Sequence, residues 1–302
     1  MSRAYIDKNV SAKPLLVNTH CHLSAVAFSV RSLDVAPRSR HIVHALRRSM
    51  LFPVALPHVP GLTFDRAYRT AENMAVIGGD WYDTLVQASG KIAVVIGDVV
   101  GHGSYAAAVM CLVRESIRAA ALEGASPSEA LTLGNRTILK GGVMTATAFV
   151  GLLDPVTMLL EYANAGHPPP LMVKSGRASA LESDGLPLGV DIHAEYGTKV
   201  ATLMGANALV LFTDGLIEYD HNGIAGEARL RGILEGWAAS GFVDDAKHLV
   251  DVTLGERLPR DDIALFILRF EGGVAPVYEL IAKNSRPCRY LCKSKCNELY
   301  NS

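Results

Sequence analysis

The chain has 302 residues, of which 49% are hydrophobic and 20% are charged, a composition typical of globular proteins. Its 29 Lys and Arg residues nearly balance its 30 Asp and Glu residues, so no bulk charge attracts nucleic acid or an anionic membrane. No uninterrupted apolar run approaches the roughly 18 residues of a membrane span. We therefore expect no nucleic-acid partner and no membrane partner.

Two further features predict a cytoplasmic protein. The apolar stretch PLLVNTHCHLSAVAFSV is interrupted by Asn18, His20 and His22, and the charges before it are mixed, which argues against a signal peptide. The five cysteines are an odd number and do not suggest a disulfide framework. Three of them recur every fourth residue in the tail, but no histidine or second cysteine pair completes a zinc spacing.

Changes in composition and periodicity along the sequence predict four segments. Residues 1–40 are irregular, and residues 41–60 form a linker helix followed by a proline-rich connection. Residues 61–271 carry the regular patterning of a folded domain, whereas residues 272–302 are a tail outside the fold. The apolar stripe of the helix at 41–50 could pair with a second copy or with an upstream regulator, although packing on its own domain is the simpler use.

Apolar, β-branched runs predict six strands in chain order. They are TFDRAYR (63–69), KIAVVIG (91–97), TATAFVGLL (145–153), MLLEYANAG (158–166), NALVLFTDG (207–215) and DIALFILRF (262–270). The dipeptide Asp154-Pro155 is a turn signal between the third and fourth of these runs. These two runs are therefore expected to form an antiparallel hairpin.

Three helices are predicted between these strands. One follows Ser104, and one lies within DDAKHLVDVTLGERL (244–258). Another begins at Ser126, a suitable N-cap, with Pro127 at the first helical position and Glu129 completing a capping box. Hairpin strands with few helices between them favour a layered α+β fold with antiparallel sheets over a doubly wound parallel sheet.

Aspartates recur where the apolar runs begin or end. Asp80 follows two glycines, Asp98 ends the run IAVVIG, and Asp214 ends the run ALVLFT. The pair Asp261-Asp262 opens the last run. A single strand-end aspartate beside glycine is usually a turn residue. Repetition of the pattern suggests that these aspartates are paired or bind cations, because a buried carboxylate otherwise costs several kcal/mol.

Clustered carboxylates without a paired-histidine or cysteine motif favour Mg²⁺ or Mn²⁺. Two such ions, held roughly 3.5–4 Å apart, can trap and activate a water for in-line attack on phosphorus. Glycines beside the carboxylates would let main-chain carbonyls approach the ions. The pattern therefore indicates a phosphoryl-transfer site.

Seven motifs, taken in order, carry a resemblance to a known family: GGDWYD, GDVVGHG, TATAFVGLLD, NAGHPPPL, GLPLG, LVLFTDGLIE and DDIALFILR. Between about Leu51 and Phe270 the chain resembles the PPM-type (protein phosphatase 2C-like) serine/threonine phosphatases, in the bacterial branch of SpoIIE and RsbU. The resemblance implies an α+β fold, a four-layer αββα sandwich of two antiparallel sheets flanked by helices.

The same resemblance implies a ligand set for two Mn²⁺ or Mg²⁺ ions. Asp80 and Asp98 would be the central ligands, with Asp98 bridging the ions, and the carbonyl of Val99 would be a main-chain ligand. Asp214 and Asp261 would complete the second ion's shell and so share the catalytic role that these carboxylates exert through the metals. Asp262 is the alternative to Asp261, because neighbouring strand residues point to opposite faces.

Other motif residues receive structural interpretations. His102 could act as a general acid, but we favour a role in bracing its loop. His167 is explained by packing and by the rigidity of the three following prolines. Asp83 is left as a structural residue or one that supports the ligands. Val100 departs from the resemblance, which implies a small or hydroxyl residue between Asp98 and Gly101.

The function implied by the resemblance is hydrolysis of phosphoserine or phosphothreonine on a regulatory protein by a water activated between two metals. The usual substrate in this family is a phosphorylated anti-anti-sigma factor of the STAS type, which places the protein in sigma-factor regulation and the stress response. A catalytically idle PPM-fold sensor or binding module is the alternative. A cyclic-dinucleotide synthase is disfavoured because Trp81 and Tyr82 follow GGD, and a P-loop is disfavoured because no Lys-Ser/Thr pair follows the glycine-rich loop.

Overall fold

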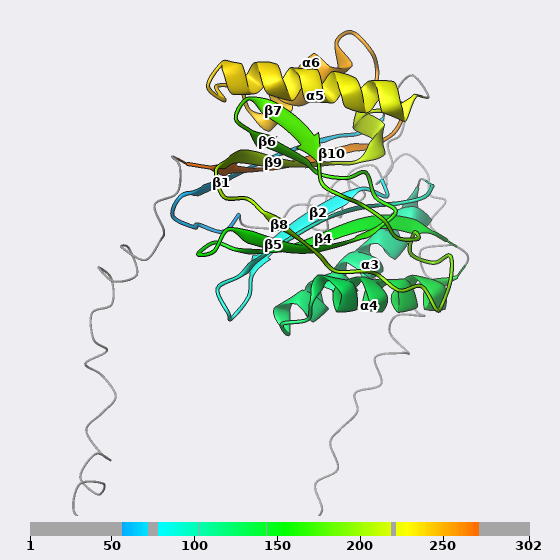
Figure 1. Cartoon of the computed structure of the whole chain (residues 1–302). Helices are drawn as coiled ribbons and strands as arrows, with labels where there is room; N and C mark the ends of the chain where they lie inside the picture. The colour runs from blue at the N-terminus through cyan, green and yellow to red at the C-terminus, as the bar shows by residue number, and fades with distance from the viewer. Residues whose placement is uncertain (1–55, 72–77, 102, 143, 219–221, 272–302) are drawn as a thin grey trace, which may run out of the picture.

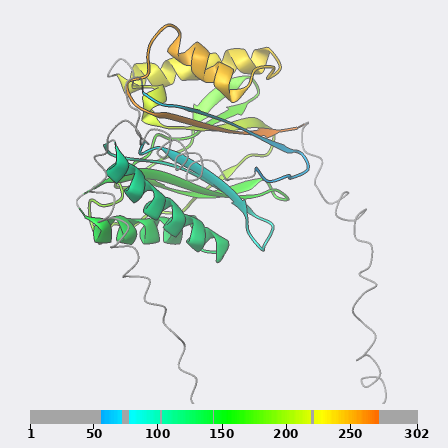
Figure 2. The same ribbon diagram turned by 180° about the vertical axis from the view of Figure 1, so that it is seen from behind.

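The computed structural model describes residues 56–71, 78–101, 103–142, 144–218 and 222–271. In this part of the chain two antiparallel sheets face each other, and a pair of helices covers the outer face of each sheet (Figures 1 and 2). The predicted four-layer αββα sandwich is therefore confirmed. The predicted segment 1–40, the helix at 41–50 and the tail at 272–302 lie outside the described residues.

Each sheet has five strands, and every strand pairs with its neighbours in the antiparallel sense. Sheet A has the order β1-β10-β9-β6-β7, with β1 (Leu62–Arg69), β10 (Ile263–Phe270), β9 (Ala206–Phe212), β6 (Leu171–Lys174) and β7 (Arg177–Ala180). Sheet B has the order β2-β3-β4-β5-β8, with β2 (Trp81–Val86), β3 (Ile92–Val99), β4 (Ala146–Asp154), β5 (Leu159–Ala165) and β8 (Lys199–Thr202).

Strand β3 shows why the apolar runs predict strands so well. Ile92, Val94 and Ile96 lie in the core between the two sheets, whereas Val95 lies in the core between sheet B and its helices. Successive side chains of a strand point to opposite faces, so a strand covered on both faces is apolar throughout. The two middle layers of the sandwich therefore carry the continuous apolar runs of the sequence.

Helices α3 (Ser104–Leu122) and α4 (Pro127–Gly141) cover sheet B, and α5 (Gly223–Ala239) and α6 (Ala246–Leu254) cover sheet A (Figure 1). The predicted capping box of α4 is present, since the Ser126 hydroxyl accepts the N–H of Glu129 and the Glu129 carboxylate accepts the N–H of Ser126. No helix within the described ranges is both long and apolar enough to span a membrane.

Helix α5 is not among the predicted elements. Its four glycines, of which Gly226 is buried, lower the intrinsic helix propensity of the segment. Burial of Leu230, Leu234 and Trp237 against sheet A stabilises it instead. Gly226 also allows a close approach, because a Cβ atom there would lie 1.8 Å from the carbonyl oxygen of Ile217. Tertiary packing therefore overrides local propensity in this helix.

Four strands are also absent from the prediction, namely β2, β6, β7 and β8. Three of them have only four residues, which is too short for an alternating pattern to be recognised. Strand β2 has the sequence WYDTLV, in which a buried aspartate interrupts the apolar residues. The sequence alone therefore does not identify β2 as a buried strand, because it does not reveal the partner that allows this aspartate to be buried.

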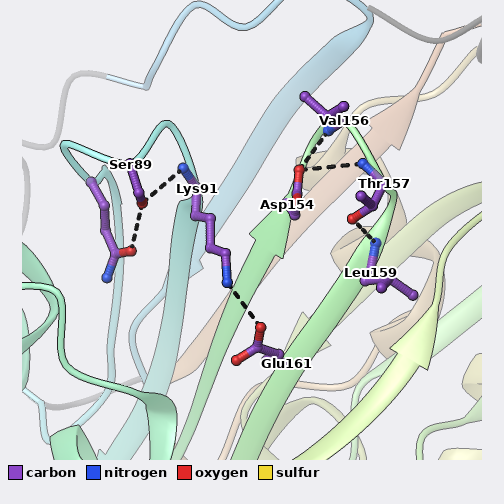
Figure 3. A network of polar contacts seen from close by, with 8 residues as sticks. Ser89, Lys91, Asp154, Val156, Thr157, Leu159 and Glu161 are labelled. Carbon is purple, nitrogen blue, oxygen red and sulfur yellow. Dashed lines mark hydrogen bonds and ion pairs between the residues drawn. The ribbon is translucent and has the colours of Figure 1, made fainter.

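The predicted hairpin at Asp154-Pro155 is confirmed. Strands β4 and β5 pair along their length, and the Asp154 carboxylate accepts the N–H groups of Val156 and Thr157 in the connecting turn (Figure 3). These bonds lower the pKa of Asp154 against the opposing effect of desolvation. On the same sheet, Lys91 donates to Glu161 at 2.9 Å across the strand between them (Figure 3).

Asp83 anchors helix α3 to sheet B. This aspartate of β2 is only 1% exposed, and its two carboxylate oxygens lie 2.6 Å from Arg118 Nη1 and 3.5 Å from Arg114 Nε. Both arginines belong to α3, the helix that follows the loop after Asp98. Asp83 is thus a structural residue, and its ion pairs tie α3 to the edge strand β2.

We predict that Asp83→Asn lowers the free energy of unfolding by about 3 kcal/mol, because it removes the buried acidic partner of two arginines. Urea denaturation measures this change. Glu115→Gln is the matched control, since Glu115 also contacts Arg114 but is 63% exposed, and a change below about 1 kcal/mol is expected there. Equal effects of the two substitutions would contradict an anchoring role for Asp83.

Candidate metal centre

The predicted site residues lie at one end of the two facing sheets. On sheet B, Asp80 directly precedes β2 and Asp98 lies near the end of β3. On sheet A, Asp214 begins the short 3-10 helix after β9, and Asp261 lies two residues before β10. Because neighbouring strands are antiparallel, the start of one lies beside the end of the next. Residues from four separate strand ends are thereby brought to the same edge of the sandwich.

Asp80 is held across the two sheets by Thr213. Asp80 is 1% exposed, and its Oδ2 accepts the Thr213 hydroxyl at 2.7 Å. Thr213 is itself fixed to β10, because its Oγ1 accepts the N–H of Ala264 and its own N–H donates to the Ala264 carbonyl. The role of Thr213 is not predicted from the sequence, where a single hydroxyl at the end of an apolar run carries no distinguishing signal.

Asp80 and Asp98 form a crowded acidic pair. Burial, followed by the charge of Asp98 and a hydrogen bond shared with it, raises the pKa of Asp80 well above its usual value. Burial also raises the pKa of Asp98 to about 7, opposed by the hydrogen bond from Asp80 and reinforced by the charges of Asp214, Asp261 and Asp262. The same hydrogen bond raises the pKa of Asp80 and lowers the pKa of Asp98, because the two carboxyls share one proton.

Asp214 and Asp261 belong to the same electrostatic centre. Burial and then the negative charges of Asp261 and Glu218 raise the pKa of Asp214. Asp261 is exposed, and its Oδ1 accepts the N–H of Asp262 at 2.8 Å. The involvement of Glu218 is not predicted, although it lies within the quoted motif LVLFTDGLIE.

These carboxyls do not converge on one point as they stand. Among the described residues, no group of three or more His, Cys, Asp or Glu side chains has an arrangement that could hold an ion. Asp80 and Asp98 approach to hydrogen-bonding distance, whereas Asp214 and Asp261 act on Asp98 through their charges. The assignment of individual ligands therefore stays a prediction.

Asp262 points into the fold and is anchored there. Its Oδ2 accepts the hydroxyl of Tyr68 at 2.9 Å and its Oδ1 accepts the N–H of Ala71 at 3.0 Å. A Cβ atom on Gly78 would lie 1.4 Å from Asp262 Oδ2, so only glycine fits at that position. The two adjacent aspartates thus have different surroundings, one buried between loops and the other exposed beside Asp214.

The glycine before Asp80 brings a main-chain carbonyl into the acidic centre. A Cβ atom on Gly79 would lie 2.1 Å from the carbonyl oxygen of Val99 and 2.8 Å from Asp98 Oδ1. The N–H of Val99 donates to the Gly79 carbonyl at 3.2 Å. Carboxylates together with a carbonyl are the oxygen ligands that Mg²⁺ and Mn²⁺ accept, so the donor set fits the predicted metals.

Of the two motif histidines, the structure describes only His167. His102 lies outside the described residues. His167 is 3% exposed, and burial lowers its pKa to about 3, so the ring is neutral at physiological pH. Its Nδ1 lies 2.8 Å from the Thr147 hydroxyl. His167 is therefore a buried residue, as packing would require, but its ring also makes a polar contact with Thr147.

We predict a pH-dependent stability for the protein kept free of metal with a chelator. The pKa of Asp98 rises from 3.8 to about 7 on folding, so its protonated form favours the folded state. This contribution is complete at low pH and is lost as the pH rises through about 7. Asparagine cannot ionise, so the melting temperature of Asp98→Asn should decline less than that of the unsubstituted protein as the pH rises to about 7. An unchanged slope in the variant would contradict the crowded acidic pair.

Comparison with known proteins identifies relatives with the same folding unit. Phosphoserine phosphatase RsbU of Bacillus subtilis (strain 168) is 28% identical over 200 residues, which are 64% of this chain and 59% of RsbU. Phosphoserine phosphatase RsbP of the same organism is 24% identical over 149 residues, which are 47% of this chain and 37% of RsbP. The chain thus spans about three-fifths or less of the length of these relatives.

Solved structures share the four-layer fold. The RsbU and RsbW domains of a Mycobacterium tuberculosis protein match with a TM-score of 0.64 and 32% identity, over 73% of this chain and 63% of that one. The PP2C phosphatase domain of SpoIIE from Bacillus subtilis matches with a TM-score of 0.58 and 16% identity, over 79% of this chain and 76% of that one.

A family model described as stage II sporulation protein E (SpoIIE) matches residues 88–271, which are more than half of the 302 residues. This range includes Asp98, Asp214 and Asp261, and it ends just after the last strand of sheet A. The chain belongs to the stage II sporulation protein E (SpoIIE) family.

Proposed function

We propose that this chain is a metal-dependent protein phosphatase that hydrolyses phosphoserine or phosphothreonine on a regulatory protein. The observation that carries the proposal is the acidic centre, in which carboxyls from both sheets share one edge and burial raises the pKa of Asp80, Asp98 and Asp214. Such crowding is costly unless cations neutralise it. The relatives RsbU and RsbP are both named phosphoserine phosphatases.

Two Mn²⁺ or Mg²⁺ ions would be held by Asp80, Asp98, the carbonyl of Val99, Asp214 and Asp261. Asp98 would contribute to both ions, because the charges of Asp214 and Asp261 on sheet A act on it and Asp80 shares a hydrogen bond with it. We assign Asp261 rather than Asp262, since each carboxylate oxygen of Asp262 already accepts a hydrogen bond from Tyr68 or Ala71.

The ions, when bound, supply an activated water and neutralise charge on the phosphoryl oxygens. The protein's own residues orient the carboxylates, as the Thr213 hydroxyl does for Asp80. No cysteine nucleophile is required. Cys111 of α3 is half-buried and its pKa is raised by burial, so it is a poor nucleophile. The neutral ring of His167, with a pKa of about 3, does not supply the leaving-group proton at physiological pH.

The substrate we propose is a phosphorylated anti-anti-sigma factor of the STAS type. This assignment rests on the resemblance to the SpoIIE and RsbU branch and on the 28% identity to RsbU. The acidic centre lies at the edge of the sandwich, and the exposure of Asp261 there supports access by a phosphoserine on a folded partner protein. The proposal includes a role in sigma-factor regulation.

Purified protein with Mn²⁺ and a phosphoserine peptide is expected to release inorganic phosphate. Asp98→Asn should reduce the release to background, because it removes the carboxylate shared by both ions. A malachite-green assay measures the phosphate, and a phosphorylated STAS domain in place of the peptide tests the substrate class. Mn²⁺ binding without turnover of the peptide or the phosphorylated domain would contradict the phosphatase and favour the idle binding module.

Substitution of the adjacent aspartates separates their roles. Asp261→Asn is expected to weaken Mn²⁺ binding and to leave the metal-free melting temperature unchanged or raised. Asp262→Asn should instead lower the metal-free melting temperature, because Asp262 ties Tyr68 and Ala71 to the start of β10. Isothermal titration and thermal melting measure the two effects. If Asp262→Asn abolished Mn²⁺ binding in a stably folded protein while Asp261→Asn bound normally, the ligand assignment would be reversed.

A further inference from the structure

Hydrogen bonds from a buried neighbour hold the main chain of His167 in place. Its main-chain N–H donates to Asn164 Oδ1 at 2.7 Å, and its carbonyl accepts Asn164 Nδ2 at 2.8 Å. Asn164 is buried in β5 and also donates to Ser183 Oγ at 2.5 Å. The turn between them needs glycine, because Gly166 has a φ of +69° and a Cβ atom there would lie 2.8 Å from Pro187. The backbone of His167 is therefore fixed before its ring makes any contact.

The ring of His167 reaches toward both sheets. On sheet B, His167 Nδ1 and Thr147 Oγ1 share a hydrogen bond of 2.8 Å, and Thr147 of β4 is the direct pairing partner of Asp98 in β3. Burial lowers the pKa of the ring, and the main chain of Phe212 on sheet A opposes this shift. Phe212 ends β9, one residue before Thr213 and two before Asp214.

Packing alone does not explain this histidine. His167 is 3% exposed, and among the described residues its Nε2 makes no hydrogen bond of ordinary geometry, although the Phe212 main chain is near. A buried polar atom without a well-formed partner destabilises the folded state. An apolar side chain of similar size would avoid that cost. The position therefore calls for a polar ring that contacts Thr147.

We propose that His167 is a positioning residue for the metal centre, and that its ring, fixed by Asn164 and hydrogen-bonded to Thr147, holds the strand end that carries Asp98 in place. This inference rests on the proposed function, because it assumes that cations bind at the same site. His167 is not among the proposed metal ligands. It acts on Asp98 through the paired residue Thr147.

Two substitutions of Thr147 provide a matched test. Thr147→Val keeps the shape of the side chain but removes the hydroxyl that contacts His167, whereas Thr147→Ser keeps the hydroxyl. Mn²⁺ affinity is measured by the electron paramagnetic resonance signal of free Mn²⁺, with the full chain and without substrate. Thr147→Val is expected to weaken binding by about 10-fold or more, the usual effect of losing a group that orients a ligand. Thr147→Ser should bind within about 3-fold of the unsubstituted protein.

A stability control separates positioning from general loosening of the fold. Asp83→Asn is expected to destabilise the protein through α3, at a buried ion pair distinct from the His167 contact. If Asp83→Asn weakened Mn²⁺ binding as much as Thr147→Val did, the proposal would be overturned, and so it would be if Thr147→Val bound Mn²⁺ normally. Absence of Mn²⁺ binding by the unsubstituted protein would instead refute the proposed function itself.

Discussion

The constraint on which the site depends is the burial of like charges at the facing ends of two sheets. Asp80 and Asp98 lie on one sheet, Asp214 lies on the other, and burial raises the pKa of all three. Each carboxyl would be far more stable in water, and their mutual repulsion adds to the cost. An enzyme gains from such an arrangement because cations that relieve the repulsion are bound tightly where they are needed.

Hydrogen bonds near the strand ends hold the acidic residues and their neighbours in place. Thr213 on sheet A donates to Asp80 on sheet B, and Tyr68 of β1 donates to Asp262 at the start of β10. The His167 ring connects to Thr147 beside Asp98. The apolar core between the sheets holds the strands in register, while these polar contacts fix their ends. The apolar core thus supplies most of the stability, while the polar contacts at the strand ends supply the geometry of the acidic centre.

The sequence predicts those parts of the structure that depend on local pattern. Strands such as β3, buried on both faces, appear as continuous apolar runs, and the capping box of α4 can be read directly. Helix α5 escapes prediction because its glycines are tolerated only through packing on sheet A. The aspartates of the centre stand out as charges at strand ends. Thr213 does not, because its importance arises from a contact 133 residues away in the sequence.

The central claim is that carboxylates from both sheets share a pair of cations. Crystals of the full chain soaked in Mn²⁺, with diffraction data collected at the manganese absorption edge, test it directly. Two anomalous peaks are expected between the strand ends, both within coordination distance of Asp98, with Asp80 and Asp214 among the other ligands. The account would be contradicted by fully occupied Mn²⁺ sites elsewhere on the protein and no peak beside Asp98.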